Sequence, residues 1–264
     1  MTPRPDGRPS RAEIWVLGAA GLATFFGLWA ALSGFGFVSP RFLPSPAAVA
    51  MRGIFLLAHP FAGASLPVHV LSSLGRYGLG FLLGACVGVP LGLLMGWYRL
   101  LDDIVTPIFD ALRFVAPIAW VPFAALWFGT GIGGPVMVIF AGAFPPCLIN
   151  AYRGARFVDK KFLEAARTLG AGNLRIIVEV LLPASVPSIV AGLRVGAGLG
   201  WQSLVGAELI VASSGVGYMM VQGQSAVSTT TVLSGMVAIG IVGYLVDLVL
   251  REIQTATQRR RGLA

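Results

Sequence analysis

Residues 77–98 read YGLGFLLGACVGVPLGLLMGWY and carry no charged side chain, whereas Arg76 and Arg99 flank them directly. Because a helix needs about 20 mostly apolar residues to cross the hydrocarbon core of a bilayer, this stretch predicts a membrane-spanning helix. Glycines recur in it at every fourth position, which places them along one helix face where a neighbouring helix can pack closely. These predicted packing positions are Gly80, Gly84, Gly88, Gly92 and Gly96.

The rest of the chain has the composition of a membrane protein. Its 264 residues are 56% hydrophobic and 11% charged, whereas about 25% of the residues of a soluble domain are charged. Apolar runs recur as far as residue 250, so a cleavable signal peptide does not account for them. An uncharged run at 114–152 is too long for one span and is divided by GTGIGGP at 129–135. We therefore expect an all-α, polytopic protein with about six spans, at residues 14–32, 77–98, 107–128, 135–152, 187–211 and 232–250.

The distribution of Lys and Arg predicts how these spans are oriented. Short segments rich in Lys and Arg stay in the cytoplasm, and most of these residues fall in three segments that alternating spans place on one side. The three are an N-terminal tail at 1–13, a loop at 153–183 and a basic C-terminal tail at 251–264. Both termini are therefore expected in the cytoplasm. The first external loop then contains Arg41, Arg52 and Arg76.

Two external segments are expected to contain short helices of their own. After the turn-rich SPRFLPSP at 39–46, residues 47–58 could form a short interfacial helix. Residues 213–231 carry no charge and are broken by Gly215 and Gly217, which favours a short re-entrant or external helix.

Several classes of function are disfavoured by the residues present. The net charge of +8 could suggest a nucleic-acid partner, but the charges lie between apolar segments and at the ends, so topology explains them and no nucleic acid is expected. Cys86 and Cys147 lie inside apolar runs, which indicates packing rather than a disulfide. His59 and His69 lack the spacing of a metal site. We find no catalytic cluster and no phosphate-binding GxxxxGK[ST] loop, so we expect neither catalytic residues nor a metal or cofactor in this chain.

The predicted cytoplasmic loop at 153–183 contains a spaced motif. Glu-Ala-Ala is followed after three residues by Gly and, further on, by Leu-Pro, at positions Glu164, Ala165, Ala166, Gly170, Leu182 and Pro183. This spacing resembles the EAA motif of the binding-protein-dependent permeases of ABC importers, with Val180 in place of the usual Ile. We expect a helix, a left-handed turn at Gly170 and Gly172, and a second helix capped by Asn173. Without the spacing match, a solvated basic loop would be the simpler interpretation.

The resemblance covers roughly residues 43–251. Within this family, the sequence is similar to one subgroup, the nitrate, sulfonate and taurine permeases. This similarity is carried by LPSP at 43–46, SSLGRYGLGF at 72–81, APIAWVPFAALWFG at 116–129 and GLRVGAGLGWQSLVGAELI at 192–210. The resemblance implies a type I ABC importer permease in the bacterial inner membrane, with Glu164 and Gly170 coupling it to an ATPase. It further implies an ATPase dimer that binds ATP and Mg²⁺, a soluble substrate-binding protein, and a second permease copy that we expect to be identical.

Ionisable residues inside the predicted spans are candidates for the solute pathway, because charge is costly in lipid. Arg194, Trp201 and Glu208 recur at seven-residue spacing near one helix face, with the two charges about 21 Å apart. Arg194 or Arg113 could attract an anionic solute. The charges could equally form pairs between helices or snorkel from the end of a span to the membrane surface, and Asp110 with Arg113 fits a local i, i+3 pair. A secondary transporter or channel working without an ATPase is the alternative function, although no inverted repeat is recognisable.

Overall fold

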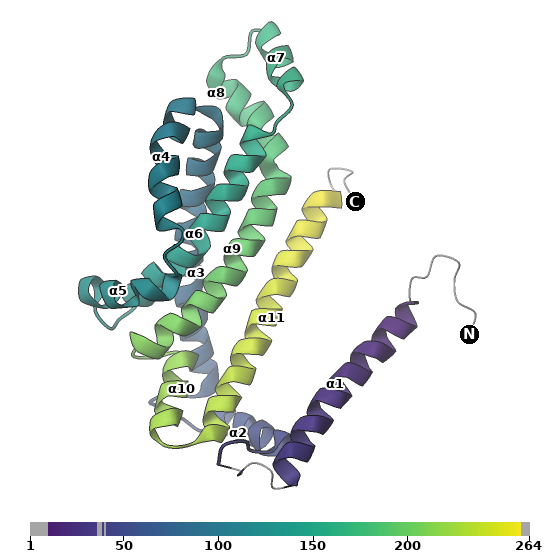
Figure 1. Cartoon of the computed structure of the whole chain (residues 1–264), viewed down its shortest axis with the longest axis vertical. Helices are drawn as coiled ribbons and strands as arrows, with labels where there is room; N and C mark the ends of the chain where they lie inside the picture. Colours follow the sequence, from purple (N-terminus) through teal and green to yellow (C-terminus); the bar gives the residue numbers. More distant parts are fainter. Residues whose placement is uncertain (1–9, 36–38, 40, 260–264) are drawn as a thin grey trace.

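In the computed structural model, which describes residues 10–35, 39 and 41–259, every regular element of that part of the chain is helical (Figure 1). Five helices there are long and apolar enough to cross a membrane, or up to six if a bent pair is one span, so the all-α, polytopic prediction is confirmed. The long helices are α1 (Arg11–Gly34), α3 (Leu66–Trp97), α6 (Gly133–Arg156), α9 (Leu182–Ile210) and α11 (Thr229–Arg259). The shorter ones are α2 (Pro46–Ala58), α4 (Arg99–Leu112), α5 (Val121–Phe128), α7 (Lys160–Thr168), α8 (Asn173–Ile176) and α10 (Val216–Ser225).

The helix that contains most of the predicted span at 77–98 begins before that span. Helix α3 starts at Leu66, so Arg76 lies inside a helix and is 5% exposed, and its placement in an external loop was wrong. An arginine in an apolar sequence marks the edge of a span only when it reaches polar surroundings, and Arg76 instead has a partner within the protein. The predicted spans at 14–32, 135–152 and 232–250 fall inside α1, α6 and α11.

The predicted tails are helical where the structure describes them. Residues 251–259 continue α11, and Ser10 caps α1, accepting a hydrogen bond at 3.2 Å from the backbone N–H of Glu13. The rest of both tails, 1–9 and 260–264, lies outside the described residues.

The predicted third span at 107–128 is not one straight helix. Helix α4 ends at Leu112, and the chain bends by 87° before the 3₁₀ turn at Pro117–Trp120 and α5. The bend has a local cause, because the residue before a proline is disfavoured in the helical region. Ala116 is accordingly extended, with φ −56° and ψ 139°. Gly129, at φ +67°, then ends α5.

Helix α6 packs between α3 and α9, and glycines make this close approach possible. A Cβ added at Gly80 would lie 2.6 Å from the Cβ of Ile139, and one at Gly96 would lie 2.5 Å from the Cβ of Ala155. On the other side, a Cβ at Gly192 of α9 would lie 2.5 Å from the Cβ of Asn150. All five glycines of the α3 row face α6 in this way. The core that results contains small buried residues of α6, Ala143, Cys147 and Ala151.

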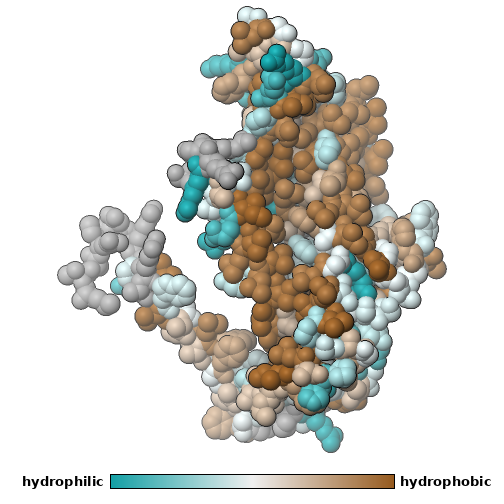
Figure 2. Space-filling model, turned by 180° about the vertical axis from the view of Figure 1, so that it is seen from behind, coloured by the Kyte–Doolittle hydropathy of each residue, from teal (hydrophilic) through white to brown (hydrophobic). Residues whose placement is uncertain are grey.

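Different short helices lie at the two ends of the molecule (Figure 1). Helices α7 and α8 lie at one end, and α2 and α10 lie at the other. On the face shown in Figure 2, the surface between them is mainly apolar, and hydrophilic residues lie at both ends and at one edge. Helix α1 stands apart from the bundle and is tied to the α2 end, where the indole N–H of Trp29 donates to the carbonyl of Pro44 at 3.0 Å. The apolar body fits a lipid environment.

Candidate coupling and translocation site

The spaced motif of the loop at 153–183 forms a projecting helix, turn and helix. The side chain of Asp159 accepts from the backbone N–H of Lys161 at 3.0 Å and so caps α7, which carries Glu164, Ala165 and Ala166. Gly170 ends α7 with φ +79°, a left-handed conformation that glycine adopts at little cost. The predicted turn is therefore present at Gly170.

Two details of this turn differ from the prediction. Gly172 is extended, with φ −71° and ψ 162°, and it is not left-handed. Asn173 is the first residue of α8 and does not cap it, since Gly172 occupies the N-cap position without a side-chain hydrogen bond. A glycine there leaves the first N–H groups of α8 to other acceptors.

The coupling segment, as we call residues 159–181, presents its motif outward. Glu164 is exposed, and no cation among the described residues lies within ion-pair distance of its carboxylate. Phe162, Leu169 and Leu174 are 63%, 87% and 76% exposed. Exposed apolar side chains around an unpaired carboxylate are typical of a docking surface.

The second half of the motif lies at the base of a long helix. Leu182 and Pro183 begin α9, which continues without a break from α8 through a π-helical turn at Ile177–Leu181. The proline has no N–H to offer the preceding turn, and a π-helical turn is one way in which a helix accommodates this loss. The last part of the coupling segment, from Asn173, and α9 therefore form one continuous helix over Asn173–Ile210.

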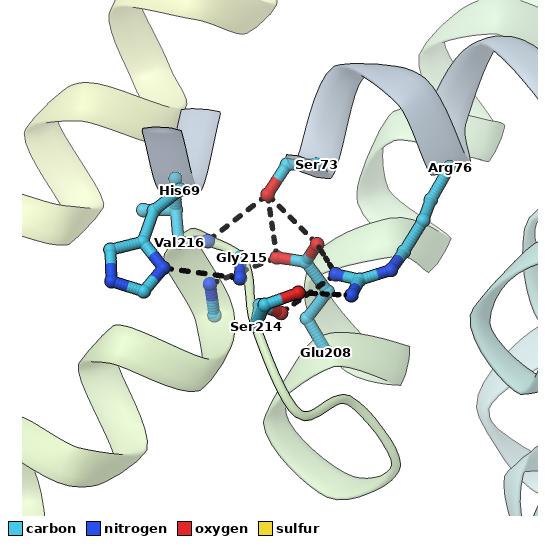
Figure 3. A network of polar contacts seen from close by, with 8 residues as sticks. His69, Ser73, Arg76, Glu208, Ser214, Gly215 and Val216 are labelled. Atoms are coloured by element: carbon cyan, nitrogen blue, oxygen red, sulfur yellow. Dashed lines mark hydrogen bonds and ion pairs between the residues drawn. The ribbon is translucent and has the colours of Figure 1, made fainter. Parts of the chain in front are cut away.

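At the opposite end of α9, Glu208 lies in a buried polar cluster (Figure 3). Its carboxylate oxygen Oε1 is 3.0 Å from Nη1 of Arg76, and the two side chains are 1% and 5% exposed. The hydroxyl of Ser73 lies 2.8 Å from both carboxylate oxygens, and the backbone N–H of Gly217 donates to Oε2 at 3.0 Å. Arg76 also donates to the carbonyl of Ser214 at 2.7 Å and to its hydroxyl.

His69 extends the polar cluster in a defined tautomer. Its Nδ1 lies 3.2 Å from the backbone N–H of Gly215, so this nitrogen accepts. Its Nε2 must then carry the proton, and it donates to the carbonyl of Phe61 at 3.0 Å. Gly215 has φ +105°, and a Cβ there would strike the carboxylate of Glu208. The cluster therefore requires glycine at this position.

The other pathway candidates on α9 are also paired with neighbouring helices. Arg194 forms two hydrogen bonds with Asp247 of α11, from Nε at 3.1 Å and from Nη2 at 3.2 Å, and it also donates to Gln254. Trp201 packs edge-on against Tyr77 with ring centroids 5.2 Å apart. Arg194, Trp201 and Glu208 therefore do not form one open row, and the interhelix alternative describes both charges.

Sequence reasoning missed His69, Ser73 and Arg76 as members of one cluster. Their spacing of four and three residues places them on one helix face, and this spacing was a usable signal. The cluster was missed because Arg76 was interpreted as the residue that flanks a span.

Arg113 lies in a groove of about 590 Å³ where the α4–α5 bend meets α6 and α9. The local pair expected with Asp110 is present, with Nε 3.0 Å from Oδ1. The groove is largely apolar, with Trp120, Phe140 and Phe144 in its walls, and Gln202 and Ser203 of α9 add polar groups.

Comparison with known proteins agrees with this architecture. Residues 88–262 match the family model described as "Binding-protein-dependent transport system inner membrane component". The chain is 41% identical over 221 residues to a putative ABC transporter permease protein of Methanocaldococcus jannaschii, which covers 82% of this chain and 81% of that protein. It is 34% identical over 235 residues to the taurine transport system permease protein TauC of Escherichia coli, covering 88% and 85%. Other relatives are named as permeases for aliphatic sulfonates, nitrate and bicarbonate.

The fold is also known from a solved structure. A chain of the MetNI methionine ABC transporter, in an inward-facing conformation, superposes with a TM-score of 0.62 at 23% identity, covering 73% of this chain and 95% of that chain. This likeness confirms the permease fold predicted from the sequence. Together with the family match, it shows that the chain is an inner-membrane permease and belongs to the family of binding-protein-dependent transport system inner membrane components.

Proposed function

We propose that this permease imports a small solute with an anionic group, that an ATPase subunit drives it through the coupling segment, and that the solute passes through the groove beside Arg113. One observation carries the coupling part of the proposal. The exposed, unpaired Glu164 projects on α7, and a short turn joins α7 to the helix Asn173–Ile210, the longest helical stretch in the described chain. A force applied at α7 would therefore reach α9 through this turn and α8.

The proposed solute class follows from the relatives and from the groove. Taurine, sulfonates, nitrate and bicarbonate, for which relatives are named, all carry an oxyanion group. In the groove, Arg113 offers a guanidinium whose fork of N–H donors suits such groups. Its side chain is 35% exposed, so it is reachable, and Asp110 offsets its charge, which favours passage over tight retention. Arg194 is less suited because Asp247 and Gln254 already occupy its donors.

The proposed assembly contains partners that supply energy and substrate. An ATPase dimer would bind ATP and Mg²⁺ and would receive α7 of each permease copy. A second, identical permease copy would close the groove from its open side. A soluble binding protein would deliver the solute at the opposite end, where α2 and α10 lie.

Uptake by the purified chain in proteoliposomes tests this proposal. With the cognate ATPase, binding protein and ATP present, we expect uptake that stops when any of the three is omitted. Glu164→Ala should abolish uptake while leaving the bundle intact, and Glu252→Ala, the same change at an exposed glutamate outside the coupling segment, is the matched control. Uptake at full rate without the ATPase would instead support a secondary transporter or channel.

A further inference from the structure

The buried cluster around Glu208 lies at the far end of the helix that begins in the coupling segment. The continuous helix Asn173–Ile210 has 38 residues, which at 1.5 Å per residue gives a length of about 57 Å. Glu208 is the third residue from its end, after which the chain turns into α10. One helix thus runs from the turn that follows α7, the proposed ATPase contact, to the opposite end of the molecule.

At that end, side chains hold the start of α10 residue by residue (Figure 3). Arg76 binds Ser214, and His69 accepts from the N–H of Gly215. Ser73 accepts from the N–H of Val216 at 3.0 Å, and Glu208 accepts from that of Gly217. Helix α10 has no side-chain cap of its own, since its N-cap residue is Gly215.

Glu208 and Ser73 therefore do for α10 what a local cap does for most helices. They satisfy N–H groups that have no partner within the helix, and a carboxylate is favoured at the positive end of the helix dipole. Because this cap comes from α3 and α9, α10 cannot move away from them without leaving buried polar groups unpaired.

Stability alone does not explain a buried ion pair here. Replacing such a pair by apolar residues of similar volume is often neutral or stabilising. In addition, Nε of Arg76 is buried without an acceptor among the described residues, so the arrangement is not fully satisfied. Burying this polar cluster costs free energy, and the cluster lies where α3, α9 and α10 meet. This placement points to a role in fixing the position of α10 relative to the other two helices.

We infer that Arg76 and Glu208 are positioning residues that clamp α10 to the outer ends of α3 and α9, so that α10 follows α9 when the coupling segment moves. This inference rests on the proposed function, because it assigns α10 as the element at which ATPase-driven motion reaches the outer end of the permease. Neither residue is assigned contact with the solute.

Two variants separate this role from simple support of the fold. Arg76→Met with Glu208→Gln removes both charges together and so avoids an unpaired buried ion. Gly217→Ala keeps both charges but adds a Cβ that would lie 2.6 Å from the Cβ of Glu208, which displaces α10. Gly198→Ala on α9 is the matched control, because nothing lies within 4 Å of the added Cβ.

The experiment measures coupling and clamping separately. The complex is reconstituted with its ATPase and binding protein, and taurine, nitrate and bicarbonate are offered to the wild type to choose the probe. In the assembled double variant and in Gly217→Ala, ATP hydrolysed per solute imported should rise about tenfold, as expected when hydrogen bonds at a joint are lost. Amide hydrogen exchange at Val216 and Gly217 should rise by about the same factor. Gly198→Ala should match the wild type in both.

A purely structural role would lower the amount of complex and leave the ratio of ATP to solute unchanged, and that result in both variants would overturn the inference. If the double variant does not assemble, Gly217→Ala decides. If the wild type itself shows no ATP-dependent uptake, the proposed function fails. The exchange measurement on the purified chain still tests the clamp, and unchanged exchange in the variants would refute it.

Discussion

The glycine face of α3 allows a stability prediction whose size follows from the structure. In Gly92→Ala, the added Cβ would contact the carbonyl oxygen of Leu148 and would lie 2.9 Å from the amide nitrogen of Tyr152 and 3.0 Å from the Cβ of Ala151. The first two are backbone atoms of α6, so neither can rotate away. Overpacking of this kind costs about 1–3 kcal/mol, and we expect Gly92→Ala to destabilise the chain by that amount.

Gly78→Ala is the control on the same helix. Nothing lies within 4 Å of a Cβ at this position, and alanine favours a helix over glycine by up to about 1 kcal/mol. This variant should therefore be neutral or slightly stabilised.

Thermal unfolding of the purified protein in detergent, followed by tryptophan fluorescence, measures the difference. For a chain of this size, 1 kcal/mol shifts the midpoint by about 2–4 °C, so Gly92→Ala should unfold about 2–12 °C below the wild type. The reasoning would be refuted if the two variants had the same midpoint, because contact with α6 would then not distinguish the two faces of α3.

Three further predictions concern the polar residues. Arg76→Ala should destabilise the folded chain by about 3–5 kcal/mol because it leaves Glu208 buried and unpaired. Arg194→Ala should cost no more than about 1 kcal/mol, since its pair with Asp247 is partly exposed. The thermal unfolding midpoints of the two variants test this difference. His69→Ala removes the acceptor of the Gly215 N–H and should cost about 1–3 kcal/mol, which chemical denaturation would detect. Arg113→Gln should raise the KM for the imported anion by about tenfold or more with normal assembly, as expected for a lost charge-assisted contact; an unchanged KM would remove Arg113 from the pathway.

The spans were predictable because hydropathy is a property of each segment by itself. An uncharged run of suitable length must form a helix in lipid whatever its neighbours are, and α1, α6 and α11 contain their predicted ranges. The glycine row of α3 was predictable for the same reason, since its spacing follows from helix geometry alone. The turn at Gly170 likewise depends on local spacing.

The third span shows a signal that was visible but not used. Pro117 follows Ala116, and a residue before proline tends to leave the helical region. The sequence therefore indicated a break between α4 and α5, although hydropathy alone favoured one span at 107–128. The direction of the 87° bend depends on packing and could not be predicted.

The pairing of the buried charges was beyond sequence reasoning for a different reason. Arg76 and Glu208 are 132 positions apart, and Arg194 and Asp247 are 53 apart. Either arginine could have joined either carboxylate by charge alone. Only the packing of α3, α9 and α11 decides which charges meet.

The correction at Arg76 strengthens the predicted orientation of the chain. With Arg76 counted as an external charge, the first external loop carried three arginines, which weakened the contrast with the basic cytoplasmic segments. Arg76 is instead buried and neutralised by Glu208, so it belongs to neither side. Of the two external arginines that remain, Arg52 donates to the hydroxyl of Thr231 at 3.0 Å and lies 5.2 Å from the ring of Phe55, so it too has a role within the protein. The contrast that predicts a cytoplasmic position for the basic coupling segment is then larger. With this predicted orientation, the clamp around Glu208, at the other end of α9, would lie at the external end, where a solute would enter.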